Sequence, residues 1–115
     1  MKEYSFLPIN HELIEKCHKL NEKNVPNVGS RTLEGLSNSI KNSDYNESIV
    51  LGNTVIGFVV CFQDNEQTKS YMSEIKHKNF KEISNRVKNF LYIDRIVVDD
   101  QFRNIKLGTK LYENI

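Results

Sequence analysis

Apolar residues follow two spacings along the chain, one typical of helices and one typical of strands. Apolar positions three and four residues apart predict helices over 11–22, from about 30 to 41, and over 79–88. Short runs rich in β-branched and aromatic residues predict strands over 4–7, 48–51, 54–62 and 90–98. Gly52-Asn53 predicts a tight turn between the second and third strands, and the polar segment 63–69 is expected to be irregular.

The segment 90–98 differs from the other predicted strands because its apolar run shows no clean alternation. Such a run is typical of a strand that is buried on both faces, in the middle of a sheet. A loop over 99–103 follows, and then a helical stretch with apolar residues at 105, 107, 111 and 115. The order of elements is therefore β α α β β α β α, with the second and third strands paired as a hairpin. This order predicts a single α/β domain in which helices pack on a mixed sheet.

Composition narrows the function classes. The chain has 115 residues, enough for one domain, and its 16 basic and 15 acidic residues give a net charge of +1. A nucleic-acid-binding protein would show a basic excess, so no nucleic-acid partner is expected. The longest apolar run, 55–62, is too short to span a bilayer, and residues 1–10 contain no signal peptide. Cys17 and Cys61 form neither a disulfide framework nor a metal-ligand cluster, which indicates a cytoplasmic protein without a metal site.

The junction after the predicted strand 90–98 is the first candidate for chemistry. A strand that runs through a short loop into a helix exposes backbone N–H groups at the positive end of the helix dipole, where phosphate groups bind. Gly108 lacks a Cβ and lets an anion approach the backbone, and Arg103, Lys106 and Lys110 add positive charge. An ordinary strand–loop–helix connection, with Gly108 packed against the sheet, explains the same residues. The pattern alone leaves both interpretations open.

These residues also resemble a known family. The strand 91–98, the loop Asp-Asp-Gln-Phe-Arg at 99–103 and the segment Arg-Asn-Ile-Lys-Leu-Gly-Thr at 103–109 look like motif A of the GNAT superfamily of N-acetyltransferases. The order of elements upstream is similar to the first two-thirds of that fold. The resemblance implies a GNAT-like fold and the transfer of an acetyl group from acetyl-CoA to a primary amine by direct attack. The acceptor would be a small molecule or a peptide that carries the amine.

The resemblance also implies where acetyl-CoA binds. Its pyrophosphate would lie on the loop and helix start formed by Arg103, Asn104, Ile105, Lys106, Leu107, Gly108 and Thr109. Its pantetheine arm would run along the strand beside Ile96, Val97 and Val98. Lys106 stands where the family usually has a glycine, and a lysine there either hinders the pyrophosphate or compensates with its charge.

Tyr92 and Asp94 are the predicted catalytic residues. Because they lie two positions apart on one strand, their side chains face the same side. An amine must lose a proton before it attacks, and the Asp94 carboxylate can take that proton directly or through water. The alternative is structural, with Asp94 in an ion pair and Tyr92 in the core. Arg95 is expected to point to the other side, and His77, in the basic run 76–78, to lie at a solvated helix start.

The sequence ends at Ile115, whereas the GNAT fold continues beyond this helix with another strand, another helix and usually a hairpin. We therefore expect a fragment, or a chain that forms a homodimer along the exposed edge of the strand 90–98. An isolated monomer is expected to be poorly stable and inactive. Two alternatives for function stay open: a non-catalytic acyl-CoA-binding or interaction module, and an unrelated phosphate-binding α/β protein.

Overall fold

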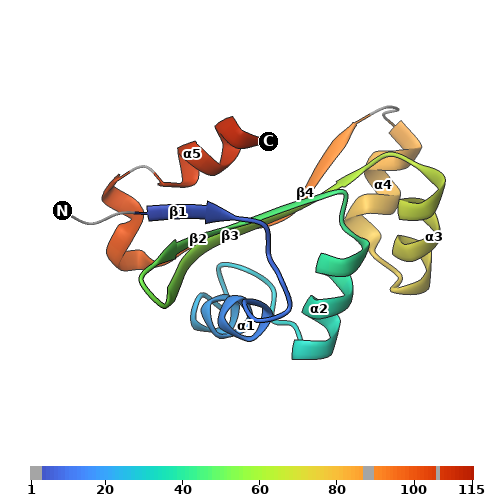
Figure 1. Cartoon of the computed structure of the whole chain (residues 1–115). Coiled ribbons are helices and arrows are strands. Elements are labelled where there is room, and N and C mark those ends of the chain that lie inside the picture. The colour runs from blue at the N-terminus through green and yellow to red at the C-terminus, as the bar shows by residue number, and fades with distance from the viewer. Residues whose placement is uncertain (1–3, 87–89, 106) are drawn as a thin grey trace.

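A four-stranded sheet forms the middle layer of the protein, with helices on both of its faces (Figure 1). The computed structural model describes residues 4–86, 90–105 and 107–115. The strands are β1 (Tyr4–Leu7), β2 (Tyr45–Leu51), β3 (Thr54–Gln63) and β4 (Leu91–Val98). The helices are α1 (Ile14–Lys23), α2 (Leu33–Asn42), α3 (Glu66–Glu74), α4 (Lys78–Arg86) and α5 (Leu107–Asn114), with the 3-10 helix η1 (Asp100–Ile105) before α5. The predicted α/β fold class is confirmed, but the sheet that was expected to be mixed is antiparallel throughout the described residues.

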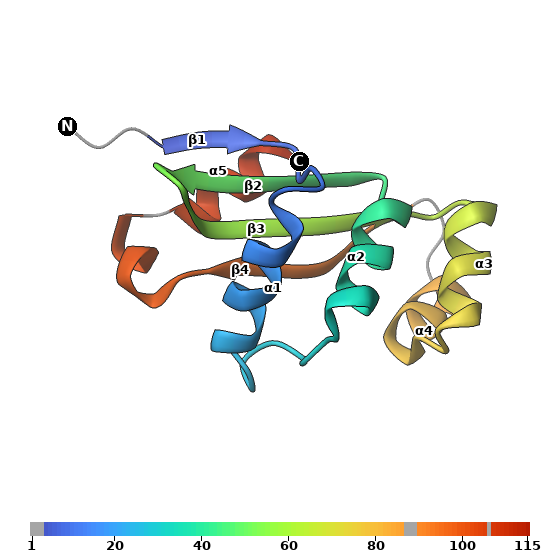
Figure 2. The same ribbon diagram turned by 60° about the horizontal axis from the view of Figure 1, so that its bottom comes forward.

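The sheet follows the order of the strands in the chain. β1, β2, β3 and β4 lie side by side in that order, and every neighbouring pair is antiparallel (Figure 2). The predicted hairpin of β2 and β3 is confirmed, and Gly52 has a φ of 62° in its turn, which glycine adopts without strain. β3 lies inside the sheet, and its residues from Val55 to Phe62 are all buried. Its apolar run therefore faces a core on both sides.

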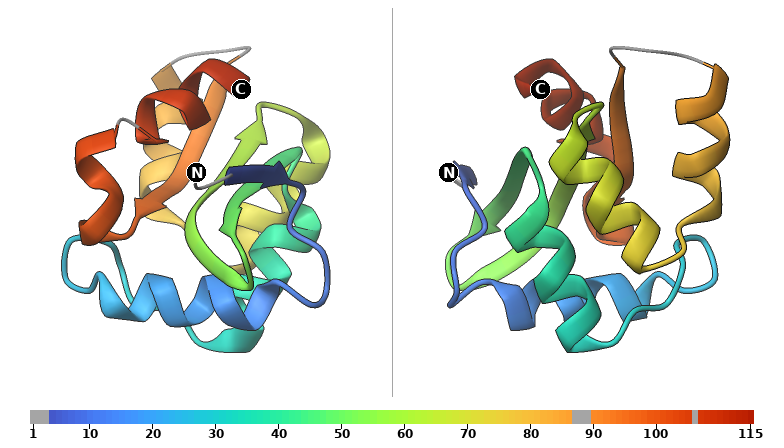
Figure 3. Two further views of the ribbon diagram at one scale, coloured as in Figure 1. Left: turned by 60° about the vertical axis from the view of Figure 1, so that its left-hand side comes forward. Right: turned by 90° about the vertical axis from the view of Figure 1, so that its right-hand side faces the viewer.

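Each face of the sheet carries its own apolar core. On one face α1 and α2 cover the strands, with α3 and α4 at one end, and on the other face lies α5 (Figures 1 and 3). The first core joins side chains of these four helices to β3 and includes Cys17, Leu20, Leu36, Ile40, Phe58, Val60, Phe62, Met72 and Phe80. The second core includes Ile49, Ile56, Val59, Cys61, Leu107 and Leu111. From Phe58 to Phe62, successive residues of β3 alternate between the two cores, as the period of two in a strand requires.

α1 begins later than its sequence pattern predicts. The expected start was His11, but the chain forms a turn over 11–13 and the helix starts at Ile14. Asn10 caps this turn, because its carbonyl oxygen and its Oδ1 both accept from the N–H of Leu13, at 3.0 and 3.1 Å. The prediction that Asn10 caps the helix was wrong, because Asn10 caps the preceding turn, and the N-cap residue of α1 is Leu13, without a side-chain hydrogen bond.

The segment 63–69, predicted to be irregular, contains the start of α3. Asn65 caps this helix through its Oδ1, which accepts from the N–H of Thr68 at 2.7 Å. Thr68, Tyr71 and Met72 then form the buried face at helical spacing. The prediction of an irregular segment was wrong because the residues are mostly polar, and the helix depends on the cap formed by Asn65. The signal was an asparagine directly before the acidic residue Glu66, which is typical of a helix start.

β4 lies at an edge of the described sheet, which is the exposed edge expected from the sequence for the strand 90–98, although its apolar run is typical of a strand in the middle of a sheet. Among residues 4–86, 90–105 and 107–115, β4 pairs only with β3. Only Arg95 and Val97 of β4 are buried, and Leu91 is 44% exposed. Alternation is unclear in this run because both faces of β4 contribute to a core.

We expect Asn65→Ala to lower the free energy of unfolding by about 1–2 kcal/mol, since the N–H of Thr68 would lose its acceptor. Asn65→Ser, which keeps an acceptor at the cap, should recover most of this loss. Urea denaturation followed by circular dichroism measures both variants. Gln67→Ala, at an exposed position of the same helix, is the control, and an equal loss there would contradict the capping role.

Candidate functional site

An irregularity in β4 brings two charged side chains to the same face of the sheet. Arg95 and Ile93 pair with consecutive residues of β3, Val60 and Cys61, so that Asp94 between them has no partner on β3. Such a bulge interrupts the alternation of side chains. Asp94 and Arg95 therefore lie on the same side, with Arg95 Nε 3.3 Å from Asp94 Oδ2. The expectation that Arg95 points to the other side was wrong for this reason.

The Asp94 carboxylate is buried and accepts hydrogen bonds from three side chains. Its Oδ1 lies 3.1 Å from Nε2 of His77 and 3.4 Å from Nη2 of Arg31, and its Oδ2 is bonded to Arg95. Only 2% of the Asp94 side chain is exposed. Burial by itself raises the pKa of Asp94, but the hydrogen bond from His77 and the charges of Arg31 and Arg95 outweigh it. Together they hold the pKa of Asp94 below its usual value.

His77 connects this carboxylate to the first turn of α4. Its Nδ1 accepts from the N–H of Phe80 at 3.2 Å, so we assign the ring proton to Nε2, which donates to Asp94. The predicted helix start is confirmed, but only 12% of the side chain is exposed, so the expectation of a solvated residue was wrong. The lysines on both sides of His77 indicated solvent, and no local pattern pointed to Asp94.

Tyr92 lies on the same face as Asp94, as predicted. Its ring meets the ring of His77 edge to face at a centroid distance of 5.4 Å, and the ring of Phe80 at 5.7 Å. Burial and the charge of Asp94 raise the pKa of the Tyr92 phenol. The structure brings the two predicted residues together around His77, which the sequence interpretation had not included in the site.

Arg95 is also buried and ties β4 to α1. Its Nη1 donates to Oδ1 of Asn21 and, at 3.1 Å, to the carbonyl oxygen of Gly29. Asn21 in turn donates to Oε2 of Glu22 at 2.8 Å. Hydrogen bonds from Ser30 and Asn21, in that order, lower the pKa of Glu22 to about 2. This chain of hydrogen bonds holds the connection between α1 and α2 against β4.

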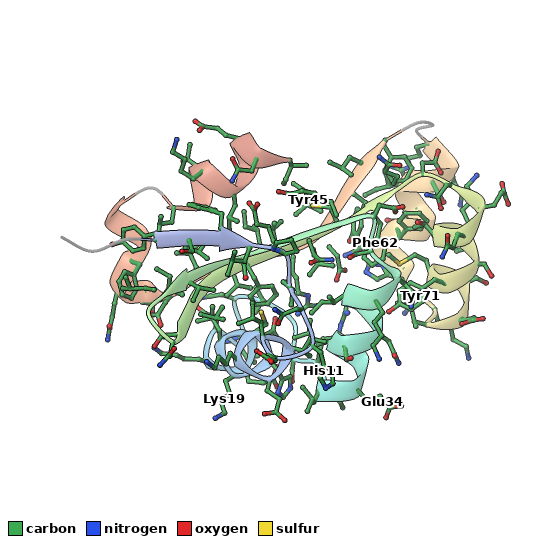
Figure 4. The ribbon with its side chains drawn as sticks, in the orientation of Figure 1. His11, Lys19, Glu34, Tyr45, Phe62 and Tyr71 are labelled. Carbon is green, nitrogen blue, oxygen red and sulfur yellow. The ribbon has the colours of Figure 1, made fainter. Side chains whose placement is uncertain are left out.

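The network continues from Arg31 towards α3. Arg31 Nη1 donates to Oγ of Ser39 at 2.8 Å, and this hydroxyl lies 2.9 Å from the Tyr71 hydroxyl. The Tyr71 ring stacks on Phe62, with the ring centroids 5.8 Å apart (Figure 4). Polar contacts thus join α2, α3 and β4 at the end of the sheet where β4 begins.

The backbone of β4 carries polar groups along its outer edge. The N–H of Asp99 donates to the carbonyl oxygen of Ile56 on β3 at 2.8 Å. This bond identifies which residues of β4 direct their backbone N–H and C=O groups towards β3. Because consecutive residues alternate in an antiparallel pair, the backbone groups of Val97 point towards β3 and those of Ile96 and Val98 point away from it. The Val97 side chain belongs to the first core. Of the three residues predicted beside the pantetheine arm, two direct their backbone groups to the outer edge.

The predicted phosphate loop coincides with η1 and the first turn of α5. Residues 103–105 form the end of η1, and Lys106 lies outside the described residues. α5 begins at Leu107, inside the segment 103–109 for which the resemblance implies a loop and the start of a helix, and Leu107 is buried in the second core. Gly108 lies against the end of β4, and Thr109 is exposed. The first turn of α5 therefore lies beside the C-terminal end of β4.

This strand–helix arrangement lies within a segment that matches a known family. A family described as "Acetyltransferase (GNAT) family" matches residues 14–115, which is most of the chain. The chain belongs to the GNAT family. Its α/β fold is consistent with this membership, which supports an acyltransferase function in general. No curated protein matches the sequence.

The described part of this GNAT chain contains neither a membrane-spanning helix nor a cluster of metal-binding side chains. There, no helix is both long enough and apolar enough to cross a membrane. The same residues contain no group of three or more His, Cys, Asp or Glu side chains arranged to hold a metal ion.

We expect Asp94→Asn to lower the free energy of unfolding of this GNAT chain by about 3 kcal/mol at pH 7, because Arg31 and Arg95 would lose the carboxylate between them. The folded-state pKa of Asp94 lies below its ordinary value. Its stabilisation is therefore present above about pH 4 and is lost as the pH falls through the folded-state pKa. Denaturation curves recorded from neutral to acidic pH should show the two proteins converging.

Glu66→Gln is the control for this comparison, because the Glu66 side chain is 95% exposed and its pair with Lys69 is long, at 3.8 Å. It should change the free energy of unfolding by less than about 0.5 kcal/mol at every pH. A difference between wild type and Asp94→Asn that does not vary with pH would contradict the buried ionic role of Asp94.

Proposed function

We propose that the protein is an N-acetyltransferase that takes its acetyl group from acetyl-CoA and passes it to a primary amine. In this proposal acetyl-CoA lies along the outer edge of β4, with its pyrophosphate at the first turn of α5. The observation that carries the proposal is the glycine at position 108, the second residue of α5.

Neither packing nor backbone conformation requires a glycine at position 108. A Cβ there would lie 3.8 Å from Cγ2 of Val98, which is an ordinary van der Waals distance. Positive φ values occur at Gly52 and Lys76 among the described residues, and not at Gly108. A glycine inside a helix costs about 0.5–1 kcal/mol relative to alanine. Close approach of a ligand to the backbone explains Gly108 better than packing against the sheet does.

The first turn of α5 and the edge of β4 carry the polar groups that such a ligand needs. The first N–H groups of a helix have no acceptors within the helix and lie at the positive end of its dipole, which suits a pyrophosphate. The backbone of Ile96, directed to the outer edge, adds one donor and one acceptor further along β4. Acetyl-CoA combines a pyrophosphate with an extended arm that contains amide groups, so both of its parts find complementary groups.

Acetyl-CoA supplies the acetyl group as an activated thioester, and the residues of the chain hold and orient the reactants. Tyr92, whose phenol carries its proton at neutral pH, is proposed as a hydrogen-bond donor beside the bulge of β4. The predicted general-base role of Asp94 stays a prediction. Since its buried carboxylate already accepts three hydrogen bonds, the geometry favours a positioning role in which Asp94 holds His77 and Arg31.

Gly108→Ala separates the two explanations of this glycine. We expect the free energy of unfolding to rise by about 0.5–1 kcal/mol, since alanine favours a helix and its Cβ fits beside Val98. We expect the affinity for acetyl-CoA to fall about tenfold, and further for Gly108→Glu, because a carboxylate repels the pyrophosphate. Thermal denaturation and isothermal titration calorimetry measure the two effects.

Asn38→Glu is the charge control, because it adds a carboxylate at an exposed position of α2, on the other face of the sheet (Figure 1). It should leave the affinity for acetyl-CoA unchanged. Unaltered affinity in both Gly108 variants would overturn the proposed binding site. Binding of acetyl-CoA without transfer to any amine would favour the alternative, a non-catalytic acyl-CoA-binding module.

A further inference from the structure

The two helices between β3 and β4 have a cavity between them. α3 and α4 lie side by side at the end of the sheet (Figures 2 and 3). The cavity has a volume of about 500 Å3, a size that suits a small ligand. Basic and apolar side chains dominate its lining: Lys69, Lys76, Lys78, Lys81, Met72 and Phe80. Antiparallel strands such as β3 and β4 can be joined by a two-residue turn. The long connection over 64–90 is therefore not needed for their pairing.

Four lysines surround this cavity, and among the described residues no acidic side chain lines it. Lys76, Lys78 and Lys81 are exposed and form no ion pair within the described part of the chain. Lys69 forms two long ion pairs, at 3.7 Å with Asp64 and at 3.8 Å with Glu66. The whole chain has a net charge of only +1, so these lysines are a local concentration of positive charge. Such a surface attracts a ligand of negative charge.

One wall of the cavity is shared with the Asp94 network. His77 lines the cavity and donates to Asp94 at 3.1 Å. Phe80, also in the lining, meets the ring of Tyr92 at 5.7 Å. Further along β4, Ile96 turns its backbone to the outer edge. His77 and Phe80 therefore form the wall between the cavity and the start of β4, and Ile96, beside which we place the acetyl arm, lies further along the same strand.

We propose that this cavity, the α3–α4 pocket, holds the anionic group of the acceptor, an amine that also carries a carboxylate or a phosphate. The inference rests on the proposed acetyl transfer and adds the charge of the acceptor to it. Lysine ammonium groups form charge-assisted hydrogen bonds with carboxylate and phosphate oxygens. Met72 and Phe80 offer apolar surface to the carbon skeleton that joins the anion to the amine.

A second hollow, between α1 and α2, has the opposite charge. It has a volume of about 460 Å3 and is lined by three glutamates, among them Glu34, beside His11. Figure 4 labels Glu34, on α2, and His11, in the turn before α1, both below the sheet. None of the residues that line this hollow belongs to the Asp94 network, whereas His77 connects the α3–α4 pocket to it. The observations therefore favour the basic pocket as the place for the acceptor.

Met72 reports directly on the α3–α4 pocket, because it lies in the lining and the chain has only two methionines. In protein labelled with carbon-13 at the methionine methyl groups, we expect β-alanine and O-phosphoethanolamine to shift the Met72 signal. Their counterparts without the anionic group, β-alaninamide and ethanolamine, should leave it unchanged. The anionic probe that binds more tightly identifies the preferred anion, and added salt should weaken its binding.

A double variant and its matched control test the lysines. Lys78→Ala combined with Lys81→Ala should weaken the binding of both anionic probes about tenfold. Lys16→Ala combined with Lys19→Ala removes two lysines at the same spacing on α1 and should leave binding unchanged; Figure 4 shows Lys19 on the outer side of that helix. Equal shifts with charged and uncharged amines, or binding that persists in the Lys78/Lys81 variant, would overturn the pocket as an anion site.

Kinetics separate this pocket from the proposed transfer reaction. With acetyl-CoA present, the anionic amines should be acetylated with a lower KM than their counterparts. The Lys78/Lys81 variant should raise that KM about tenfold and leave kcat unchanged. If the anionic probes shift Met72 but no amine is acetylated, the proposed function and the acceptor role fail together, and the anion site stands alone. If neutral amines are acetylated as well as anionic ones, the function stands and the acceptor role of the pocket is overturned.

Discussion

The buried carboxylate of Asp94 determines how three separate parts of the chain meet. Arg31 comes from the connection between α1 and α2, His77 from the start of α4, and Arg95 from β4 itself. A buried charge without partners costs several kcal/mol, so each segment is most stable where its donor reaches Asp94. Apolar packing is not directional and would tolerate small shifts of the helices over the sheet. The hydrogen bonds to Asp94 favour one position of the helices over the shifted ones.

The bulge in β4 makes this arrangement possible. In a regular strand Asp94 and Arg95 would point to opposite faces, and one of the two charges would enter the apolar core beneath α5. The bulge turns both side chains to one face, and alternation then resumes, so that Ile96 and Val98 pack in the second core. One strand can therefore hold an ionic network on one face and an apolar contact with α5 on the other, while its outer edge carries backbone donors and acceptors.

Sequence patterns predicted the elements that depend on apolar spacing, and they failed where polar contacts decide the structure. The hairpin of β2 and β3, and a helix after the segment that follows β4, were predicted from local spacing and from the family resemblance. α3 was missed because it depends on the cap at Asn65 more than on a long apolar stripe. The side of Arg95 and the burial of His77 depend on partners that are distant in sequence or on another strand. No local pattern contains that information.

In the proposed function, the two ends of β4 recognise their ligands by different means. At the α5 end, backbone groups make the contacts, so most side-chain substitutions leave these contacts unchanged. A substitution at position 108 is the exception, because its Cβ would lie between the backbone and the ligand. At the other end, lysine side chains make the contacts, on helices that lie outside the pairing of β3 and β4. Substitutions on the pocket surface of α3 and α4 can therefore change which acceptor binds and leave the register of the sheet intact. Substitutions at Asp94 act on both ends, because its carboxylate anchors His77 in the pocket wall and Arg95 in the strand.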